Sequence, residues 1–203
     1  MIPARFEIIR LLGKGKSGRS YLVKCRHNEY VLKEMHNEQV PYYQFTKPKI
    51  ELEIDAHAVL VKQKIKIPKM IEYDLENSYI LKEYVKGQTI TELIRNDGLD
   101  DSLILEMLKW ERDLKNSKMN IDYFPSNFVY NGMDIYYVDY EYNTYSEEWN
   151  FSNWGIYYWL NADGFRLFIE TDDPRYINEE GTGIPVKNER IIKERERILK
   201  CFG

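Results

Sequence analysis

The chain has 203 residues, of which 43% are hydrophobic and 31% are charged. These values are typical of a globular protein and exclude a chain that is disordered over most of its length. The net charge is −4, from 29 Lys and Arg against 33 Asp and Glu, so the protein as a whole does not attract nucleic acid. A local basic patch stays compatible with this charge.

The composition also bears on the compartment. Cys25 and Cys201 are too few for a disulfide framework or a zinc site, which favours a reducing environment. The first seven residues lack the long apolar core of a signal peptide, and no run is apolar and long enough to span a bilayer. We therefore expect a cytoplasmic protein without a membrane partner.

The first part of the chain predicts three strands, over residues 6–12, 20–24 and 29–33. A glycine-rich loop joins the first two strands, and its glycines are Gly13, Gly15 and Gly18. A dinucleotide site would require a helix after such a loop, whereas a strand follows here. Taken alone, the glycine-rich loop is interpreted as a flexible hairpin.

Lys33 ends the third strand and shares a strand face with Val31, because side chains two residues apart point the same way. A solvated strand lysine is the alternative to a functional one. A helix is predicted over about residues 50–64, where apolar residues recur at helical spacing. Its acids available to pair with the lysine are Glu51, Glu53 and Asp55.

Two further strands are predicted over residues 67–73 and 78–85, which makes five strands and one helix. Thr89 and Glu92 then have the spacing of a capping box, so a short helix is expected to start at Thr89. A longer helix over about 101–116 carries an apolar stripe that is typical of a helix facing a core.

The middle of the chain brings together oxygen-bearing side chains. Residues 128–138 predict a hairpin, because β-branched and aromatic runs flank an Asn-Gly turn. We expect Asn127 and Asp139, at its two ends, to lie side by side, where their oxygens would suit Mg²⁺. Asp122 is expected to face the same spot as a base. Ordinary turn residues are the alternative interpretation.

The order Asp122, Asn127, Asp139 resembles the catalytic loop and metal-binding aspartate of the protein-kinase-like phosphotransferases. Asn120 stands where that family usually has histidine, and Asp-Tyr-Glu from Asp139 replaces Asp-Phe-Gly. This segment is more similar to the choline and aminoglycoside kinases than to regulated protein kinases.

The resemblance implies roles for residues upstream. The glycine loop resembles the flap over the ATP phosphates, and Lys33 resembles the strand lysine that contacts the α- and β-phosphates. The helix pattern of the family favours Glu53 over Glu51 as its partner. Residues 83–87 resemble the hinge that holds adenine, through the C=O of Glu83 and the N–H of Val85. Lys82 would then occupy a position that is usually apolar.

The fold implied is α+β and two-lobed, with a protein-kinase-like architecture. Residues 1–85 would form a nucleotide-binding lobe of five antiparallel strands and one helix. Residues 86–203 would form a shortened, mainly helical lobe that carries the catalytic and metal-binding loops. The shortening is expected because only about sixty residues follow Glu141.

The function implied is ATP- and Mg²⁺-dependent transfer of the γ-phosphate to a hydroxyl of a small molecule or protein. Asp122 and Lys33 would be catalytic, and Asn127 and Asp139 would hold Mg²⁺. A pseudokinase that binds ATP as a scaffold is one alternative, which Asn120 and the short second lobe favour. A protein serine/threonine kinase is disfavoured, because no Ala-Pro-Glu follows to build a peptide platform.

The end of the chain offers two further hypotheses. The residues that could cage a cationic small molecule by cation–π contact are Tyr142, Tyr145, Glu147, Glu148 and Trp149. Core packing is the alternative for Trp149, Trp154, Tyr157, Tyr158 and Trp159, and it is favoured for all of these but Trp149. A terminal helix over about 186–200 is predicted, with Ile191 paired with Ile198 and Ile192 paired with Leu199 on one seam. Its mildly basic surface would suit a small kinase or ATPase in a tRNA-modification assembly, and a docked, solvated helix is the alternative.

Overall fold

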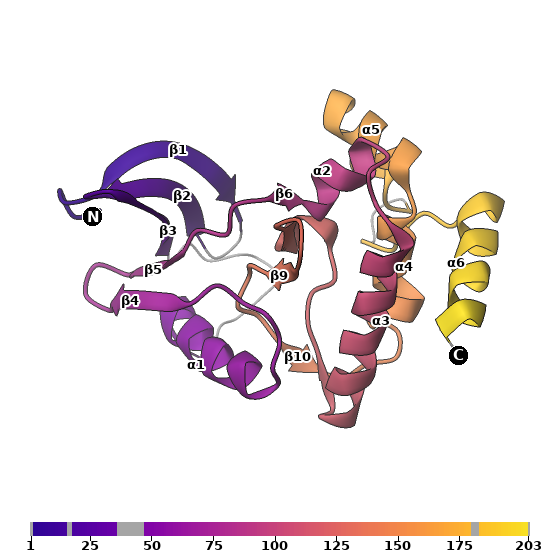
Figure 1. The fold of residues 1–203 in the computed structure, drawn as a ribbon, viewed down its shortest axis with the longest axis horizontal. Coiled ribbons are helices and arrows are strands. Elements are labelled where there is room, and N and C mark those ends of the chain that lie inside the picture. The colour runs from indigo at the N-terminus through magenta and orange to yellow at the C-terminus, as the bar shows by residue number, and fades with distance from the viewer. Residues whose placement is uncertain (1, 16–17, 36–46, 180–182, 203) are drawn as a thin grey trace. The chain divides into compact units, whose positions relative to one another are not determined.

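The computed structural model describes residues 2–15, 18–35, 47–179 and 183–202. It confirms the prediction of an α+β protein with a five-stranded antiparallel sheet, and its described part contains six α-helices (Figure 1). The chain divides into two compact units, Met1–Lys86 and Gly87–Gly203. No helix in the described part of the chain is long and apolar enough to cross a membrane.

The first unit is built on the five-stranded sheet, whose strands lie in the order β1-β2-β3-β5-β4. Its elements are β1 (Glu7–Lys14), β2 (Gly18–Cys25), β3 (Asn28–Met35), α1 (Lys49–Lys62), β4 (Met70–Asp74) and β5 (Tyr79–Glu83). All five strands and the helix predicted for this part of the chain are present. Short turns join β2 to β3 and β4 to β5, whereas β3 and β5 pair across a longer connection that contains α1 and β4.

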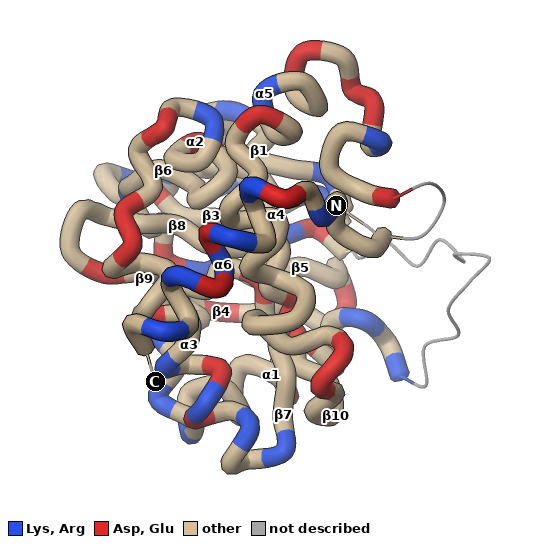
Figure 2. Tube along the Cα trace, turned by 90° about the vertical axis from the view of Figure 1, so that its right-hand side faces the viewer, with Lys and Arg blue, Asp and Glu red and all other residues tan. Residues whose placement is uncertain are grey.

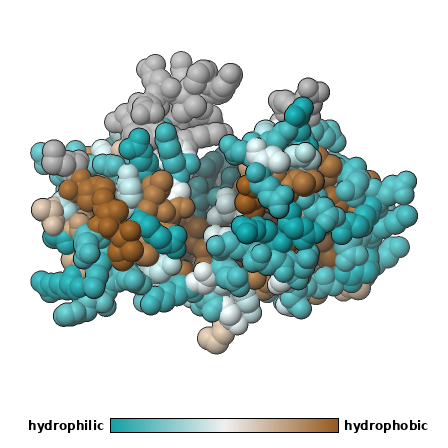
Figure 3. Space-filling view, turned by 90° about the horizontal axis from the view of Figure 1, so that it is seen from above, coloured by the Kyte–Doolittle hydropathy of each residue, from teal (hydrophilic) through white to brown (hydrophobic). Residues whose placement is uncertain are grey.

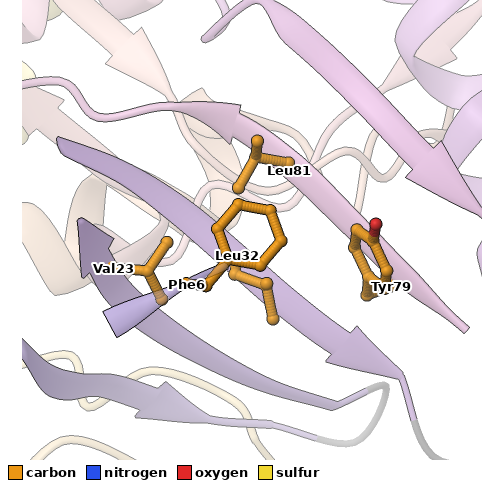
Figure 4. Packing of buried hydrophobic residues seen from close by; sticks show 5 residues of the cluster. All are labelled: Phe6, Val23, Leu32, Tyr79 and Leu81. Carbon is orange, nitrogen blue, oxygen red and sulfur yellow. The ribbon is translucent and has the colours of Figure 1, made fainter. Parts of the chain in front are cut away.

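Each face of this sheet has its own hydrophobic cluster. One cluster, drawn in Figure 4, consists of Phe6, Val23, Leu32, Tyr79 and Leu81. On the other face Met35 and Ile80 pack against Ile50 of α1. Because Lys33 lies opposite Ile80 in the β3–β5 ladder, Lys33 points to the face that α1 covers.

The edge strand β1 is exposed along its whole length. Its exposed aliphatic side chains are Ile8, Ile9, Leu11 and Leu12. Figure 3 shows a hydrophobic patch on the surface of this unit, at its left.

The second unit holds the remaining helices and short strands. Its helices are α2 (Ile90–Arg95), α3 (Asp101–Asn116), α4 (Ile156–Trp159), α5 (Ala162–Thr171) and α6 (Glu189–Phe202). A three-stranded sheet is formed by β6 (Gln88–Thr89), β8 (Phe128–Tyr130) and β9 (Ile135–Tyr137), and a two-stranded one by β7 (Met119–Asn120) and β10 (Asn143–Thr144). Pro125–Asn127 and Pro174–Tyr176 form short 3-10 helical turns. Phe151–Gly155 forms a short π-helix.

Helix starts in this unit follow local side-chain chemistry. The capping box predicted at Thr89 is present, since the Thr89 hydroxyl accepts the N–H of Glu92 at 3.2 Å and the Glu92 carboxylate accepts the N–H of Thr89 at 2.7 Å. Asp100 caps α3 by accepting the N–H of Ser102 at 2.8 Å. Both predicted helices are confirmed.

The predicted hairpin is present as β8 and β9, but its turn lies one residue further along the chain than expected. The N–H of Asn131 donates to the C=O of Asp134 at 3.1 Å, so Gly132 and Met133 are the central residues. Gly132 has φ of +96°, a conformation that a residue without Cβ adopts readily. The Asn131 side chain accepts the N–H groups of Met133 and Asp134, which explains the shift.

Aromatic side chains dominate the core of the second unit. Tyr157, Tyr158 and Trp159 are buried, so core packing accounts for them, whereas Trp149 is 43% exposed. In α6, Ile191 and Ile198 are buried as predicted. The prediction for the second pair was wrong, since Ile192 is exposed, because the next residue of a helix points about 100° away.

Candidate active-site residues

The glycine loop connects β1 with β2, and its residues 16 and 17 lie outside the described part of the chain. The N–H of Gly15 donates to the C=O of Gly18 at 2.9 Å. A Cβ on Gly18 would lie 2.2 Å from the backbone oxygen of Glu34, so close packing against β3 requires glycine there. A Cβ on Gly13 or Gly15 would meet no described atom within 4 Å.

Lys33 forms an ion pair with Glu53 of α1, and both residues are 6% exposed. The residue that pairs is therefore Glu53 and not Glu51, one of the acids that the sequence left open. The register of β3 directs the ammonium group to the helix, and Glu53 lies on the buried side of α1. Removing two charges from water costs several kcal/mol per ion, so this pair is not explained by stability alone.

Lys82 is a second buried lysine on the same sheet face. It is 4% exposed and lies opposite Val31 in the β3–β5 ladder, so it points to the side of Lys33. Burial lowers the pKa of His57 on α1, and the positive charge of Lys82 lowers it further. Lys33 and Lys82 thus lie on the same face of the sheet, the face that α1 covers.

The residues predicted to form the hinge lie at and just after the end of β5. The N–H of Glu83 donates to the C=O of Lys69 at 2.9 Å, and its side chain accepts the N–H of Lys69 at 3.2 Å. Val85 follows the strand and is half-buried. Lys69 thus anchors this end of β5.

In the second unit, residues 122–127 form one hydrogen-bonded loop. The carboxylate of Asp122 accepts the N–H of Phe124 at 3.0 Å, and its backbone C=O accepts the side-chain amide of Asn127 at 3.3 Å. The N–H of Asn127 donates to the C=O of Phe124 at 3.0 Å, and Pro125 starts the intervening helical turn. The structure therefore connects the predicted base with one predicted metal ligand.

The ends of the β8–β9 hairpin bring Asn127 and Asp139 together along the backbone. The N–H of Val138 donates to the C=O of Asn127 at 2.8 Å, directly before Asp139. A carboxamide and a carboxylate supply two oxygen ligands, and Mg²⁺ keeps water or phosphate oxygens in its remaining positions. Among the described residues, no group of three or more His, Cys, Asp or Glu is arranged to hold a metal ion.

Tyr137 is a residue of this region that the sequence analysis missed. Its side chain is fully buried, its hydroxyl accepts the N–H of Asp122 at 3.4 Å, and it donates to the C=O of Glu141 at 3.1 Å. Burial raises the pKa of Tyr137 well above its ordinary value, and the charges of Asp139, Asp122 and Glu141 raise it further. Side chains alternate along β9, so Tyr137 points to the same buried side as Ile135. This alternation in the sequence could have identified Tyr137 as a buried residue.

Asn120, at the position where the resembling family has histidine, is 3% exposed. Its side-chain amide donates to the C=O of Ser146 at 2.9 Å, and β7 pairs Asn120 with Asn143. Its Oδ1 atom is buried and has no hydrogen-bond partner among the described residues. The side chain therefore attaches the segment that precedes Asp122 to the chain that follows Asp139.

Comparison with known proteins does not extend these observations. No family model matches the chain, and a search of curated proteins found no match.

Proposed function

We propose that this chain is an ATP- and Mg²⁺-dependent phosphotransferase that moves the γ-phosphate to a hydroxyl of a small molecule or protein. The proposal includes a two-lobed, protein-kinase-like fold, with residues 1–85 as the nucleotide-binding lobe and residues 86–203 as a reduced helical lobe. The buried ion pair of Lys33 and Glu53 is the observation that carries it. A protein gains little stability from such a pair, whereas a phosphotransferase needs a lysine held charged and aimed.

In this proposal the first unit binds the nucleotide. The backbone of the glycine loop covers the phosphates, and Lys33, held by Glu53, contacts the α- and β-phosphates. The C=O of Glu83 and the N–H of Val85 hydrogen-bond adenine. The open space at Gly13 and Gly15 supports the close approach of phosphate oxygens.

The second unit supplies the remaining groups. Asn127 and Asp139 hold Mg²⁺, which neutralises charge on the phosphates when it is bound. Asp122 orients the acceptor hydroxyl and takes its proton while that oxygen bonds to the γ-phosphorus and ADP leaves. Positioning and charge stabilisation provide most of the rate, so the hydrogen bonds that hold this loop matter as much as the acid itself.

Replacement of the metal-binding carboxylate tests the proposal. Asp139→Ala is expected to abolish Mg·ATP turnover while the far-UV circular dichroism spectrum and the melting temperature stay close to those of the wild type. Asp134→Ala is the matched control, because Asp134 is a carboxylate in the turn of the same hairpin. Full activity of Asp139→Ala would refute the assignment.

Asn120 favours one alternative, a pseudokinase that binds Mg·ATP without turning it over. In the resembling family a histidine fills this position, and here a carboxamide holds the chain instead. A thermal-shift titration with Mg·ATP, followed by an assay of ADP formation, separates the two functions, because both transfer to a hydroxyl and hydrolysis release ADP. Binding with no ADP formation, with a range of small hydroxyl compounds and protein substrates present, would favour the pseudokinase.

The charges of α6 bear on the alternative of an ATPase in a tRNA-modification assembly. Figure 2 shows Lys and Arg mixed with Asp and Glu along this helix. Arg190 pairs with Asp163, and Arg197 pairs with Asp101 and Glu194. Such pairing favours a docked helix over a nucleic-acid surface, and RNA binding that weakens steeply with salt would reverse this preference.

A further inference from the structure

Tyr137 joins two segments of the second unit through one oxygen atom. Its hydroxyl accepts the N–H of Asp122 from the loop after β7 and donates to the C=O of Glu141 from the segment after β9. Asp122 is the proposed base, and Asp139, two residues before Glu141, is the proposed metal ligand. A single side chain thus holds the backbone beside both functional groups.

The ring of Tyr137 has little freedom to move. It is fully buried at the end of β9, lies opposite Phe128 in the hairpin, and its ring centre is 5.2 Å from that of Phe128. A hydroxyl on a rigid ring is a fixed point, and two hydrogen bonds to it restrict the separation of the two backbone segments. Packing therefore positions the hydroxyl, and the hydroxyl positions the loops.

We propose that Tyr137 is a positioning residue, which sets Asp122 relative to Asp139 through the backbone groups on either side of them. It touches no reacting atom. Without the hydroxyl, the ring would still fill its place in the core, but the Asp122 N–H and the Glu141 C=O would lose their shared partner. The catalytic consequence rests on the proposed phosphotransferase function, whereas the connection between the two segments does not.

The variant Tyr137→Phe keeps the ring and removes only the hydroxyl. Tyr130→Phe is the matched control, since the hydroxyl of Tyr130 donates to the C=O of Gly132 in the turn of the same hairpin, at 2.9 Å. Both variants are expected to fold with melting temperatures within a few degrees of the wild type. Hydrogen exchange and Mg·ATP kinetics are then measured on the full chain.

Hydrogen exchange tests the connection without reference to activity. We expect the amides of residues 121–124 and 138–142 to exchange about tenfold faster in Tyr137→Phe, both segments together, and to be unchanged in Tyr130→Phe. Unchanged exchange in both segments of Tyr137→Phe would overturn the proposal. Faster exchange in only one segment would also overturn it, because a connection must release both.

Kinetics test the catalytic consequence. We expect kcat for Mg·ATP turnover to fall by about ten- to a hundredfold in Tyr137→Phe, with the Mg²⁺ concentration for half-maximal rate raised and KM for ATP changed less than threefold. An equal loss in Tyr130→Phe, or unchanged kcat and Mg²⁺ dependence in Tyr137→Phe, would overturn it. Absence of turnover in the wild type would instead refute the proposed function, and hydrogen exchange would still decide whether Tyr137 connects the segments.

Discussion

The two units hold their candidate functional groups by different physical means. In the first unit an ammonium and a carboxylate, Lys33 and Glu53, are buried against each other between a strand and a helix. In the second unit Asp122 and Asn127 are held by backbone and side-chain hydrogen bonds, and Tyr137 connects their loop to the segment after β9.

This difference predicts how each unit responds to substitution. Removing one member of a buried ion pair leaves an uncompensated charge in a poorly solvated place, so the first unit should lose stability steeply. Removing one neutral hydrogen bond costs about 0.5–1.5 kcal/mol. In the second unit we therefore expect such a substitution to displace the loop that holds Asp122 and Asn127 while lowering the free energy of unfolding only slightly. The following substitutions test that contrast.

Glu53→Ala should have the largest effect, lowering the free energy of unfolding by about 3–5 kcal/mol, because the buried ammonium group of Lys33 would lose the carboxylate of Glu53. The double variant Lys33→Met, Glu53→Leu should recover most of this loss. Urea unfolding at neutral pH measures both, and Glu51→Ala on the same helix is the control. A cost below about 1 kcal/mol for Glu53→Ala would show the pair to be screened by solvent, and the contrast would fail.

Gly155→Ala tests packing beneath the loop of the second unit. An added Cβ would lie 2.5 Å from the Cβ of Tyr123 and 2.9 Å from Cδ2 of Phe151. We expect a loss of about 1–3 kcal/mol in thermal unfolding from overpacking, with turnover reduced because Tyr123 adjoins Asp122.

Gly98→Ala is the control for that substitution. Its Cβ would come no closer than 3.5 Å to a neighbouring atom, which is ordinary contact. The control should change the free energy of unfolding by less than about 0.5 kcal/mol. Equal effects of the two alanines would contradict the packing argument.

Thr89→Ala measures how much a neutral side-chain hydrogen bond contributes to the free energy of unfolding in the second unit. It removes the side-chain half of the capping box and should cost about 1 kcal/mol in urea unfolding. Thr91→Val is the control, because the Thr91 hydroxyl is buried without a hydrogen-bond partner among the described residues, and its loss should be neutral or stabilising. A cost for Thr89→Ala equal to that of Glu53→Ala would remove the distinction between the units.

Substitution of Glu111 should have the smallest effect on the free energy of unfolding. It also allows a buried carboxylate of the second unit to be compared with the buried ion pair of the first. Glu111 is 8% exposed, accepts the N–H and hydroxyl of Ser152, and burial raises its pKa above the ordinary value of 4.5. The unfolded state therefore ionises first as pH rises, so this group lowers stability progressively above about pH 4.5 until the folded pKa is passed.

The variant Glu111→Gln can still accept from Ser152 through its amide oxygen and does not titrate. We expect its free energy of unfolding, relative to the wild type, to increase between pH 4 and pH 8. Urea unfolding at several pH values measures this difference. A constant difference across the range would show that Glu111 titrates alike in both states.

Much of the secondary structure could be predicted because its signals are local. The start of α3 depends on a capping carboxylate at Asp100 and an apolar stripe that follows it, and α2 depends on Thr89 and Glu92. The hairpin followed from two aromatic and β-branched runs. Its turn was misplaced by one residue because the side chain of Asn131 bonds to the backbone of the turn itself, which competes with the Asn-Gly pattern.

The local sequence pattern determined where helices and strands lie, because helix caps, alternation and turn residues act within a few positions of one another. It also showed which residues have side chains suited to binding phosphate, binding a metal ion or acting as a base. The resemblance favoured Glu53 over Glu51, but the residue pattern left both open, and the tertiary structure shows that Glu53 meets Lys33. Only the tertiary structure shows that Tyr137 joins Asp122 to Glu141. These contacts depend on strand register and on which face of a helix or strand is buried, and both are set by packing between segments distant in the chain.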